Sequence, residues 1–147
     1  MGRFIGILLF ISTCSVAQSK YYIKNGAVAN GYDVVAYFKH KAVKGSKKYT
    51  WNYDAVSFRF ATKENLETFK KDPEKYIPQY GGYCAYAIGK SGKKVAINPK
   101  TFEIREQKLY LFYNAWGTNT LKMWLAEGAE ALKEKADHNW KTIKIKG

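Results

Sequence analysis

Residues 49–60 read Tyr-Thr-Trp-Asn-Tyr-Asp-Ala-Val-Ser-Phe-Arg-Phe. Alternate residues are aromatic or β-branched on either side of a polar break. A period of two residues is typical of a half-buried strand. Because Asp54-Ala55 interrupts the alternation, the stretch predicts two antiparallel strands joined by a tight reversal. Each strand has one apolar face, formed by Tyr49, Trp51 and Tyr53 in the first strand and by Val56, Phe58 and Phe60 in the second.

Two helices are expected directly after this hairpin. Thr62 can accept a hydrogen bond from the first turn of a helix as its N-cap, and Leu66 and Phe69 fall three residues apart on one face. Asp72-Pro73 is a second start signal, because proline is favoured at the first helical position. The segment therefore predicts one helix after Thr62 and another after Asp72.

Short apolar runs elsewhere in the chain predict further strands. Val34–Phe38 is such a run before the hairpin, and three more follow it at Val95–Ile97, Phe102–Ile104 and Leu109–Tyr113. The last two runs flank Glu106-Gln107, where a second reversal is expected although the pair lacks the usual Asn-Gly chemistry.

The last third of the chain has the period of an amphipathic helix. Gly128 is expected to divide it in two, and Trp140 is expected to be buried against the sheet. The apolar face consists of Leu121, Leu125, Leu132, Ala136 and Trp140. Together, the elements predict a small single domain of the α+β class, in which an antiparallel sheet of hairpins is packed by short helices and a C-terminal helical segment.

The first 17 residues have the pattern of a signal peptide. Arg3 precedes an apolar run from Phe4 to Ile11, and Ser15-Val16-Ala17 places small residues where a signal peptidase cuts. Cleavage is expected before Gln18. The run is too short to span a bilayer, which needs about 20 residues, so the mature chain is expected to have no transmembrane segment.

Cys14 supports an alternative in which the leader is a lipoprotein signal and this cysteine carries the lipid. Thr13 directly before it fits that signal poorly, so cleavage after Ala17 is the better interpretation. Either way the protein is expected to be exported, and with cleavage it would be periplasmic or secreted.

The rest of the chain divides into a polar, loosely attached lead-in at residues 18–30 and a domain at residues 31–143. The chain has 25 Lys and Arg against 12 Asp and Glu, a formal net charge of +13. Such a charge favours acidic partners, including anionic lipid headgroups and glycans. Because the lysines are dispersed along the chain, a solvated basic surface is the better interpretation. Nucleic acid is not expected as a partner, because no binding signature is present and the expected export argues against it.

Six motifs lie in order along the expected domain: Gly31-Tyr32-Asp33-Val34-Val35-Ala36-Tyr37-Phe38, Lys44-Gly45-Ser46, the stretch from Phe60 through Asp72-Pro73-Glu74-Lys75-Tyr76, Tyr80-Gly81-Gly82-Tyr83-Cys84-Ala85-Tyr86, Lys108-Leu109-Tyr110-Leu111 and Ala136-Asp137-His138-Asn139-Trp140. In these motifs the chain resembles exported YHS domain proteins, particularly periplasmic members from Bacteroidetes-like organisms. The resemblance covers nearly the whole mature chain. It implies a metal-binding module, because the wider family is regarded as one and is often attached to heavy-metal-transporting ATPases.

The chain departs from the family at two cysteine positions. Asp33-Val34-Val35-Ala36 stands where Asp-Pro-Val-Cys is usual, and Phe60–Asn65 contains no cysteine where the family has a Phe-Cys-Ser segment. The family's thiolate site therefore does not transfer to this chain, and the resemblance carries over the scaffold.

Cys84 is the only cysteine left after the expected cleavage, so it has no disulfide partner within the chain. A thiolate with imidazole or carboxylate neighbours suits a soft transition metal, most plausibly copper. The predicted metal ligands are Cys84, Asp33 and His138, with His40 and Met123 as further donors. Each has a structural alternative: a turn or cap for Asp33, the surface for both histidines and core packing for Met123.

Two other functions stay open. The first is a non-catalytic binding module for a small or polymeric ligand, with Tyr80, Tyr83 and Tyr86 forming a pocket beside Trp51 or Trp116. The second is a thiol-dependent enzyme, which would need a base next to Cys84. No catalytic motif accompanies the cysteine, so the sequence favours a binding protein over an enzyme.

Overall fold

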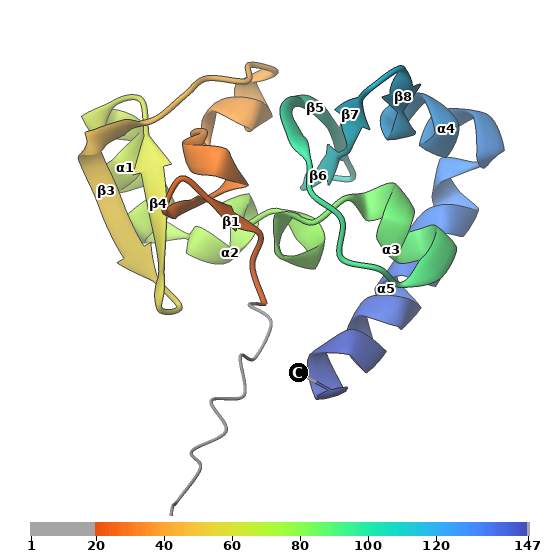
Figure 1. Ribbon diagram of the computed structural model, residues 1–147. Helices are drawn as coiled ribbons and strands as arrows, with labels where there is room; N and C mark the ends of the chain where they lie inside the picture. Colours follow the sequence, from red (N-terminus) through yellow and green to blue (C-terminus); the bar gives the residue numbers. More distant parts are fainter. Residues whose placement is uncertain (1–19, 147) are drawn as a thin grey trace, which may run out of the picture.

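The structure is a computed structural model that describes residues 20–146, with side chains described as far as residue 143. The expected signal peptide, including Cys14, lies outside these residues. The described chain forms one mixed α+β domain of helices and antiparallel hairpins (Figure 1), which confirms the expected fold class. The strands do not form the single sheet that is expected from the sequence. They form four separate two-stranded sheets, each made of two strands that are consecutive along the chain.

The strands are β1 (Ile23–Lys24), β2 (Ala27–Val28), β3 (Ser46–Tyr53), β4 (Val56–Phe60), β5 (Asn98–Arg105), β6 (Lys108–Phe112), β7 (Asn114–Ala115) and β8 (Thr118–Asn119). The α-helices are α1 (Lys63–Lys71), α2 (Pro73–Tyr76), α3 (Ala85–Ser91), α4 (Thr120–Glu127) and α5 (Ala129–Lys146). Three short 3₁₀ helices connect them: η1 (Ala29–Gly31), η2 (Ala36–Lys39) and η3 (Gln79–Gly82). No helix in residues 20–146 has both the length and the apolar character needed to cross a membrane.

Each of the four hairpins turns through two residues with positive φ: Asn25-Gly26, Asp54-Ala55, Glu106-Gln107 and Trp116-Gly117. Left-handed φ at both central positions matches the twist of the flanking strands, as in type I′ turns. Only the first pair has the preferred Asn-Gly sequence. The other three adopt the same backbone with residues that favour it less.

The central sequence predictions are confirmed. β3 and β4 pair with Trp51 opposite Phe58, and the reversal lies at Asp54-Ala55. The Thr62 side chain accepts a hydrogen bond from the backbone N–H of Asn65 at 3.1 Å and caps α1. α2 begins at Pro73, and Gly128 separates α4 from α5.

Two strand predictions are wrong. Val34 and Val35 lie in a turn that leads into η2, and residues 95–97 are irregular. In the first case the Asp33 carboxylate accepts hydrogen bonds from the N–H groups of Val35 and Ala36, at 2.9 and 3.1 Å. These bonds hold the chain in a helical turn, which a short apolar run alone cannot distinguish from a strand.

Strand β6 is buried on both faces and lies between two hydrophobic clusters. Leu109 and Leu111 point into the N-terminal cluster, and Tyr110 and Phe112 point into the C-terminal cluster. The N-terminal cluster also contains Tyr21, Val28, Ala29, Val34, Val35, Tyr37, Phe58, Phe60, Phe69, Tyr76, Cys84 and Ile97. The C-terminal cluster also contains Tyr80, Ala85, Ile88, Trp124, Ala129, Leu132, Ala136 and Trp140.

The C-terminal cluster is packed by α3, α4 and α5 (Figure 1). Trp140 is only 8% exposed, which confirms its predicted burial. Leu125 was expected on the same apolar face, but it is exposed and Trp124 occupies the core instead. Gly128 separates α4 from α5, so the apolar face of one helix does not continue along the other.

The expected lead-in is tightly packed from residue 20 onward. Tyr21 and Val28 are buried in the N-terminal cluster. The backbone N–H of Tyr22 also donates to the carbonyl of Gly81 at 2.9 Å, which joins the start of the described chain to η3.

Candidate functional site

Cys84 is completely buried at the start of α3. Its Sγ lies 3.3 Å from the Thr120 hydroxyl, and its backbone N–H donates to the carbonyl of Val95 at 3.0 Å. The side chain belongs to the N-terminal cluster and packs there as a small apolar residue.

Asp33 is also completely buried, and its carboxylate accepts four hydrogen bonds. Oδ1 accepts from the N–H groups of Val35 and Ala36, and Oδ2 accepts from the N–H of Ala61 and the amide of Asn65, each at 2.8 Å. Asp33 therefore joins the segment before η2 to the end of β4 and the first turn of α1. Both oxygens are used in these hydrogen bonds, so Asp33 has the turn or capping role that the sequence offered as the alternative to a metal ligand.

The predicted metal ligands lie in separate parts of the fold. His138 is exposed on α5, and His40 is exposed just after η2. Across residues 20–146, no three His, Cys, Asp or Glu side chains form a group that could hold a metal ion. Met123 was expected to fill the core, but its side chain is 37% exposed on α4.

The aromatic pocket expected from sequence is only partly formed. Tyr80 lines a pocket, but Trp51 and Trp116 lie elsewhere and are 40% and 97% exposed. The ring that accompanies Tyr80 is Trp140, at 6.1 Å between ring centroids and in an edge-on arrangement.

We call this site the Tyr80–Trp140 pocket. It has a volume of about 400 Å³ and opens between α2, η3, the start of β6 and α5. It is lined by Lys20, Tyr21, Glu74, Ile77, Pro78, Gln79, Tyr80, Gly81, Lys108, Asp137, Trp140 and Lys141.

A strained turn in η3 positions Tyr80 on the pocket wall. Tyr80 and Gly81 both have positive φ, at 57° and 63°. A Cβ on Gly81 would lie 1.9 Å from the carbonyl oxygen of Lys20. Only glycine therefore lets the backbone of Lys20 and Tyr21 pack directly against this turn. The left-handed backbone of Tyr80 is unusual for a bulky residue and is held by this packing.

The Tyr80 hydroxyl donates a hydrogen bond to Asp137 Oδ1 at 2.7 Å. Burial raises the pKa of Tyr80 most, and the Asp137 hydrogen bond and charge raise it further. Tyr80 therefore stays neutral and keeps its proton at physiological pH, and it fixes the Asp137 carboxylate at the pocket rim.

The charged groups of the pocket differ in how they are paired. Lys20 forms an ion pair with Asp54 at 2.7 Å, and Glu74 accepts a hydrogen bond from the Tyr53 hydroxyl at 2.7 Å. Lys108 and Lys141 have no carboxylate partner in the described part of the chain.

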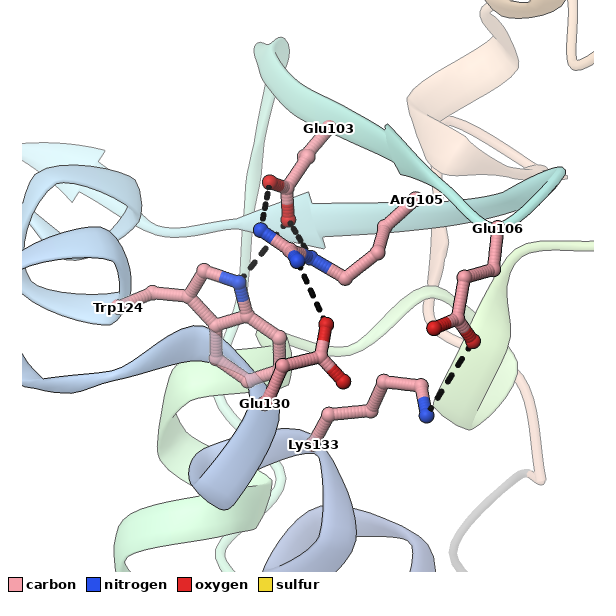
Figure 2. Close-up of polar contacts among 6 residues, drawn as sticks. All are labelled: Glu103, Arg105, Glu106, Trp124, Glu130 and Lys133. Atoms are coloured by element: carbon pink, nitrogen blue, oxygen red, sulfur yellow. Dashed lines mark hydrogen bonds and ion pairs between the residues drawn. The ribbon is translucent and has the colours of Figure 1, made fainter.

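A second polar cluster, on β5, is fully paired and is not a candidate site. Figure 2 shows Arg105 held by Glu103 through two hydrogen bonds, at 2.7 and 3.1 Å, and by Glu130 at 2.7 Å. Glu103 also accepts from the indole N–H of Trp124 at 2.9 Å. The cluster connects β5 to α4 and α5.

Comparisons of the chain with family models, with curated proteins and with solved structures gave no match. The resemblance to exported YHS domain proteins stays a prediction. The function therefore has to be argued from the pocket and its side chains.

The pocket lysines were missed at the sequence level. Lys108 begins the quoted motif Lys108-Leu109-Tyr110-Leu111, but that motif does not identify it as a binding residue, and nothing in the local sequence of Lys141 marks it among the dispersed lysines of the chain. The signal that was present lay in Tyr80-Gly81 and in Asp137 with Trp140, since both belong to the quoted motifs and both line the pocket.

Proposed function

We propose that this protein is an exported YHS-like binding module without catalytic activity, and that the Tyr80–Trp140 pocket holds a small acidic sugar or the acidic unit of a polymer. The observation that carries the proposal is the pair of lysines, Lys108 and Lys141, that face the pocket without carboxylate partners in residues 20–143. An anionic group on the ligand would supply that partner.

The size and walls of the pocket support a ligand that contains a ring. Its volume of about 400 Å³ falls within the range of about 300–1,000 Å³ for small-molecule sites. Tyr80 and Trp140 are only 3% and 8% exposed, so they offer the pocket narrow apolar edges, and the Asp137 carboxylate and Gln79 amide add hydrogen-bonding groups. A sugar acid combines apolar C–H groups, hydroxyls and a carboxylate. These would contact the aromatic side chains, the polar side chains and the two lysines of the pocket, respectively.

The two carboxylates of the pocket are oriented by tyrosine hydroxyls. Asp137 Oδ1 accepts from Tyr80, and Glu74 Oε1 accepts from Tyr53. An ionised carboxylate has about four acceptor sites, so each keeps lone pairs that can accept hydrogen bonds from ligand hydroxyls.

The test is a titration with galacturonate, with its neutral counterpart galactose as the control ligand. We expect galacturonate to shift the NMR indole signal of Trp140 and galactose to leave it unchanged. Exposed ion pairs contribute about 0.2–1 kcal/mol each, so Lys108→Ala combined with Lys141→Ala should weaken binding by about twofold to thirtyfold.

The matched control is the double variant Lys63→Ala with Lys71→Ala, two exposed lysines on α1 that do not line the pocket. It removes the same charge from the protein and should bind galacturonate as the wild type does. Equal losses in both double variants would attribute the binding to net charge and would refute a site at this pocket.

Soft-metal binding at Cys84, with Asp33 or His138 as further ligands and copper as the metal, stays a prediction that depends on the YHS resemblance. The thiol-dependent enzyme also stays a prediction. Neither is strengthened by the surroundings of Cys84, where Thr120 is the nearest hydrogen-bonding side chain.

A further inference from the structure

The β7–β8 hairpin ends in a tryptophan that does not pack against the fold. Trp116 is 97% exposed, and no ring or hydrogen-bond partner is recorded for its side chain within the described residues. Large aromatic side chains normally stabilise a protein by burying 150–250 Å² of surface. Trp116 contributes almost none of that to this fold.

The backbone at Trp116 makes the choice of residue more unusual. Its φ is +53°, and Gly117 follows at +78°. This is the turn position at which Asn is favoured, as the Asn25-Gly26 turn of the same protein illustrates. A bulky residue in the left-handed region is strained. Neither packing nor turn preference explains Trp116, and such a conflict often marks a functional position.

The helix that follows presents a compatible surface. At 100° per residue, the exposed side of α4 carries Leu125, Lys122, Ala126 and Met123 in angular order, with the exposed Glu127 next to Met123 at the helix end. Three of these side chains are apolar, and Leu125 and Met123 are among the most exposed large apolar residues of the described chain. The fourth is a lysine, whose stem can lie along an apolar surface while its ammonium group reaches outward.

The hairpin and the helix are joined at their base. The N–H and hydroxyl of Thr120 both donate to the carbonyl of Tyr113, at 3.0 and 2.7 Å. Figure 1 shows β7, β8 and α4 together at one end of the molecule. Trp116 is therefore carried on a short, anchored hairpin rather than on a free loop.

The unpaired charge of this region is basic. Residues 114–127 contain one lysine, Lys122, and one acidic residue, Glu127, which is paired with Lys90 Nζ at 3.8 Å, in a chain of net charge +13. Lys122 has no ion-pair partner in residues 20–143. Tryptophan is enriched where protein meets the membrane–water interface, and basic chains are attracted to anionic lipid.

We propose that the β7–β8 turn and the exposed side of α4 form a peripheral docking surface for an anionic lipid bilayer, with Trp116 as the side chain that inserts. Lys122 then contacts the headgroups, and Met123 and Leu125 lie at the boundary of the acyl chains. This surface is separate from the Tyr80–Trp140 pocket, whose lining shares none of these residues.

The test is cosedimentation of the mature protein with vesicles of phosphatidylcholine alone and with vesicles that contain equal parts of phosphatidylglycerol. We expect binding to the anionic vesicles only, weakened by added salt because the attraction is screened. Trp116→Ala should lower the partition coefficient about tenfold or more, because most of the inserted apolar area is lost.

Two further variants keep the test decisive. Trp51→Ala is the matched control, because Trp51 is also exposed but lies on β3 with Lys70 Nζ 4.1 Å from its ring centroid. It should bind vesicles as the wild type does. Trp116→Asn should lose binding while its thermal stability is unchanged or higher, since Asn suits the left-handed turn position.

Equal binding by Trp116→Ala and the wild type would overturn the proposal, and so would equal binding to both kinds of vesicle or no vesicle binding at all. A loss of stability in Trp116→Asn would assign Trp116 to the fold and would overturn it as well. None of these results bears on galacturonate binding, so the two proposals fail independently.

Discussion

The surroundings of Cys84 and Asp33 differ from those of the Tyr80–Trp140 pocket in how polar groups are satisfied. Asp33 accepts four hydrogen bonds in the interior, and Cys84 is fully buried beside Thr120. The pocket instead leaves the Lys108 and Lys141 ammonium groups without an anionic partner in residues 20–143. A residue whose bonding capacity is already used supports the fold, whereas unpaired charge beside a cavity is available to a ligand.

The comparison is sharpest at Asp33, where the largest effect is expected. Asp33→Ala leaves the buried N–H groups of Val35, Ala36 and Ala61 and the amide of Asn65 without their acceptor. Each such group costs about 1–3 kcal/mol when unsatisfied. We expect the free energy of unfolding to fall by roughly 4 kcal/mol or more in chemical denaturation.

Asp72→Ala is the control for this experiment. Asp72 is an exposed aspartate at the start of α2, and its side chain makes no cap hydrogen bond. Its loss should cost less than about 0.5 kcal/mol, as is usual for a surface substitution. A similarly small cost at Asp33 would mean that the fold does not depend on its carboxylate, which could then act as a metal ligand.

Cys84 should resist modification in the folded protein. Because its side chain is fully buried, a thiol reagent should label it at the rate of unfolding, with rapid labelling only in denaturant. The same protein can be titrated with copper(I) against a competing chelator. Fast native labelling, together with one equivalent of copper lost in Cys84→Ser, would restore the metal site as the functional centre.

Tyr80 should make stability fall at alkaline pH. Burial and Asp137 raise its pKa in the folded state above the ordinary value of 10.0. Above that ordinary value the unfolded chain releases the Tyr80 proton and the folded protein keeps it, so unfolding becomes more favourable as pH rises. The contribution is fully present below pH 10.0 and is lost above it.

Tyr80→Phe should reduce this alkaline loss of stability. The measurement is the thermal unfolding temperature, followed from neutral pH to pH values above the ordinary tyrosine pKa of 10.0. Tyr113→Phe is the control, because Tyr113 is partly buried and lies outside the pocket lining. An unchanged pH dependence in Tyr80→Phe would mean that the hydroxyl is not held in the folded protein as described.

Much of the fold could be predicted because its signals are local. The alternation in residues 49–60, the Thr62 cap and the break at Gly128 each act within a few residues, and each is confirmed. The strand expected at Val34–Phe38 is instead a turn that is closed by local bonds from Val35 and Ala36 to Asp33 and supported by distant ones. The Asp33 carboxylate that closes this turn is held by Ala61 and Asn65, 28 and 32 residues later in the chain.

The candidate site was predictable only in part because its contacts are non-local. Tyr80-Gly81 and Trp140 stood out as sequence motifs, but their pairing depends on how α5 packs against η3. Lys141 has no distinguishing local pattern, and the motif that begins at Lys108 does not mark this lysine as a binding residue. Their importance comes from facing one cavity without an acidic partner, which is a property of the folded chain.

The most direct test of this account is the affinity for galacturonate measured on three proteins: the wild type, Cys84→Ser and the double variant Lys108→Ala with Lys141→Ala. We predict that the wild type and Cys84→Ser bind with the same affinity and that the double variant binds about twofold to thirtyfold more weakly. A loss of binding in Cys84→Ser, with the double variant unaffected, would contradict the account and place the function at the cysteine.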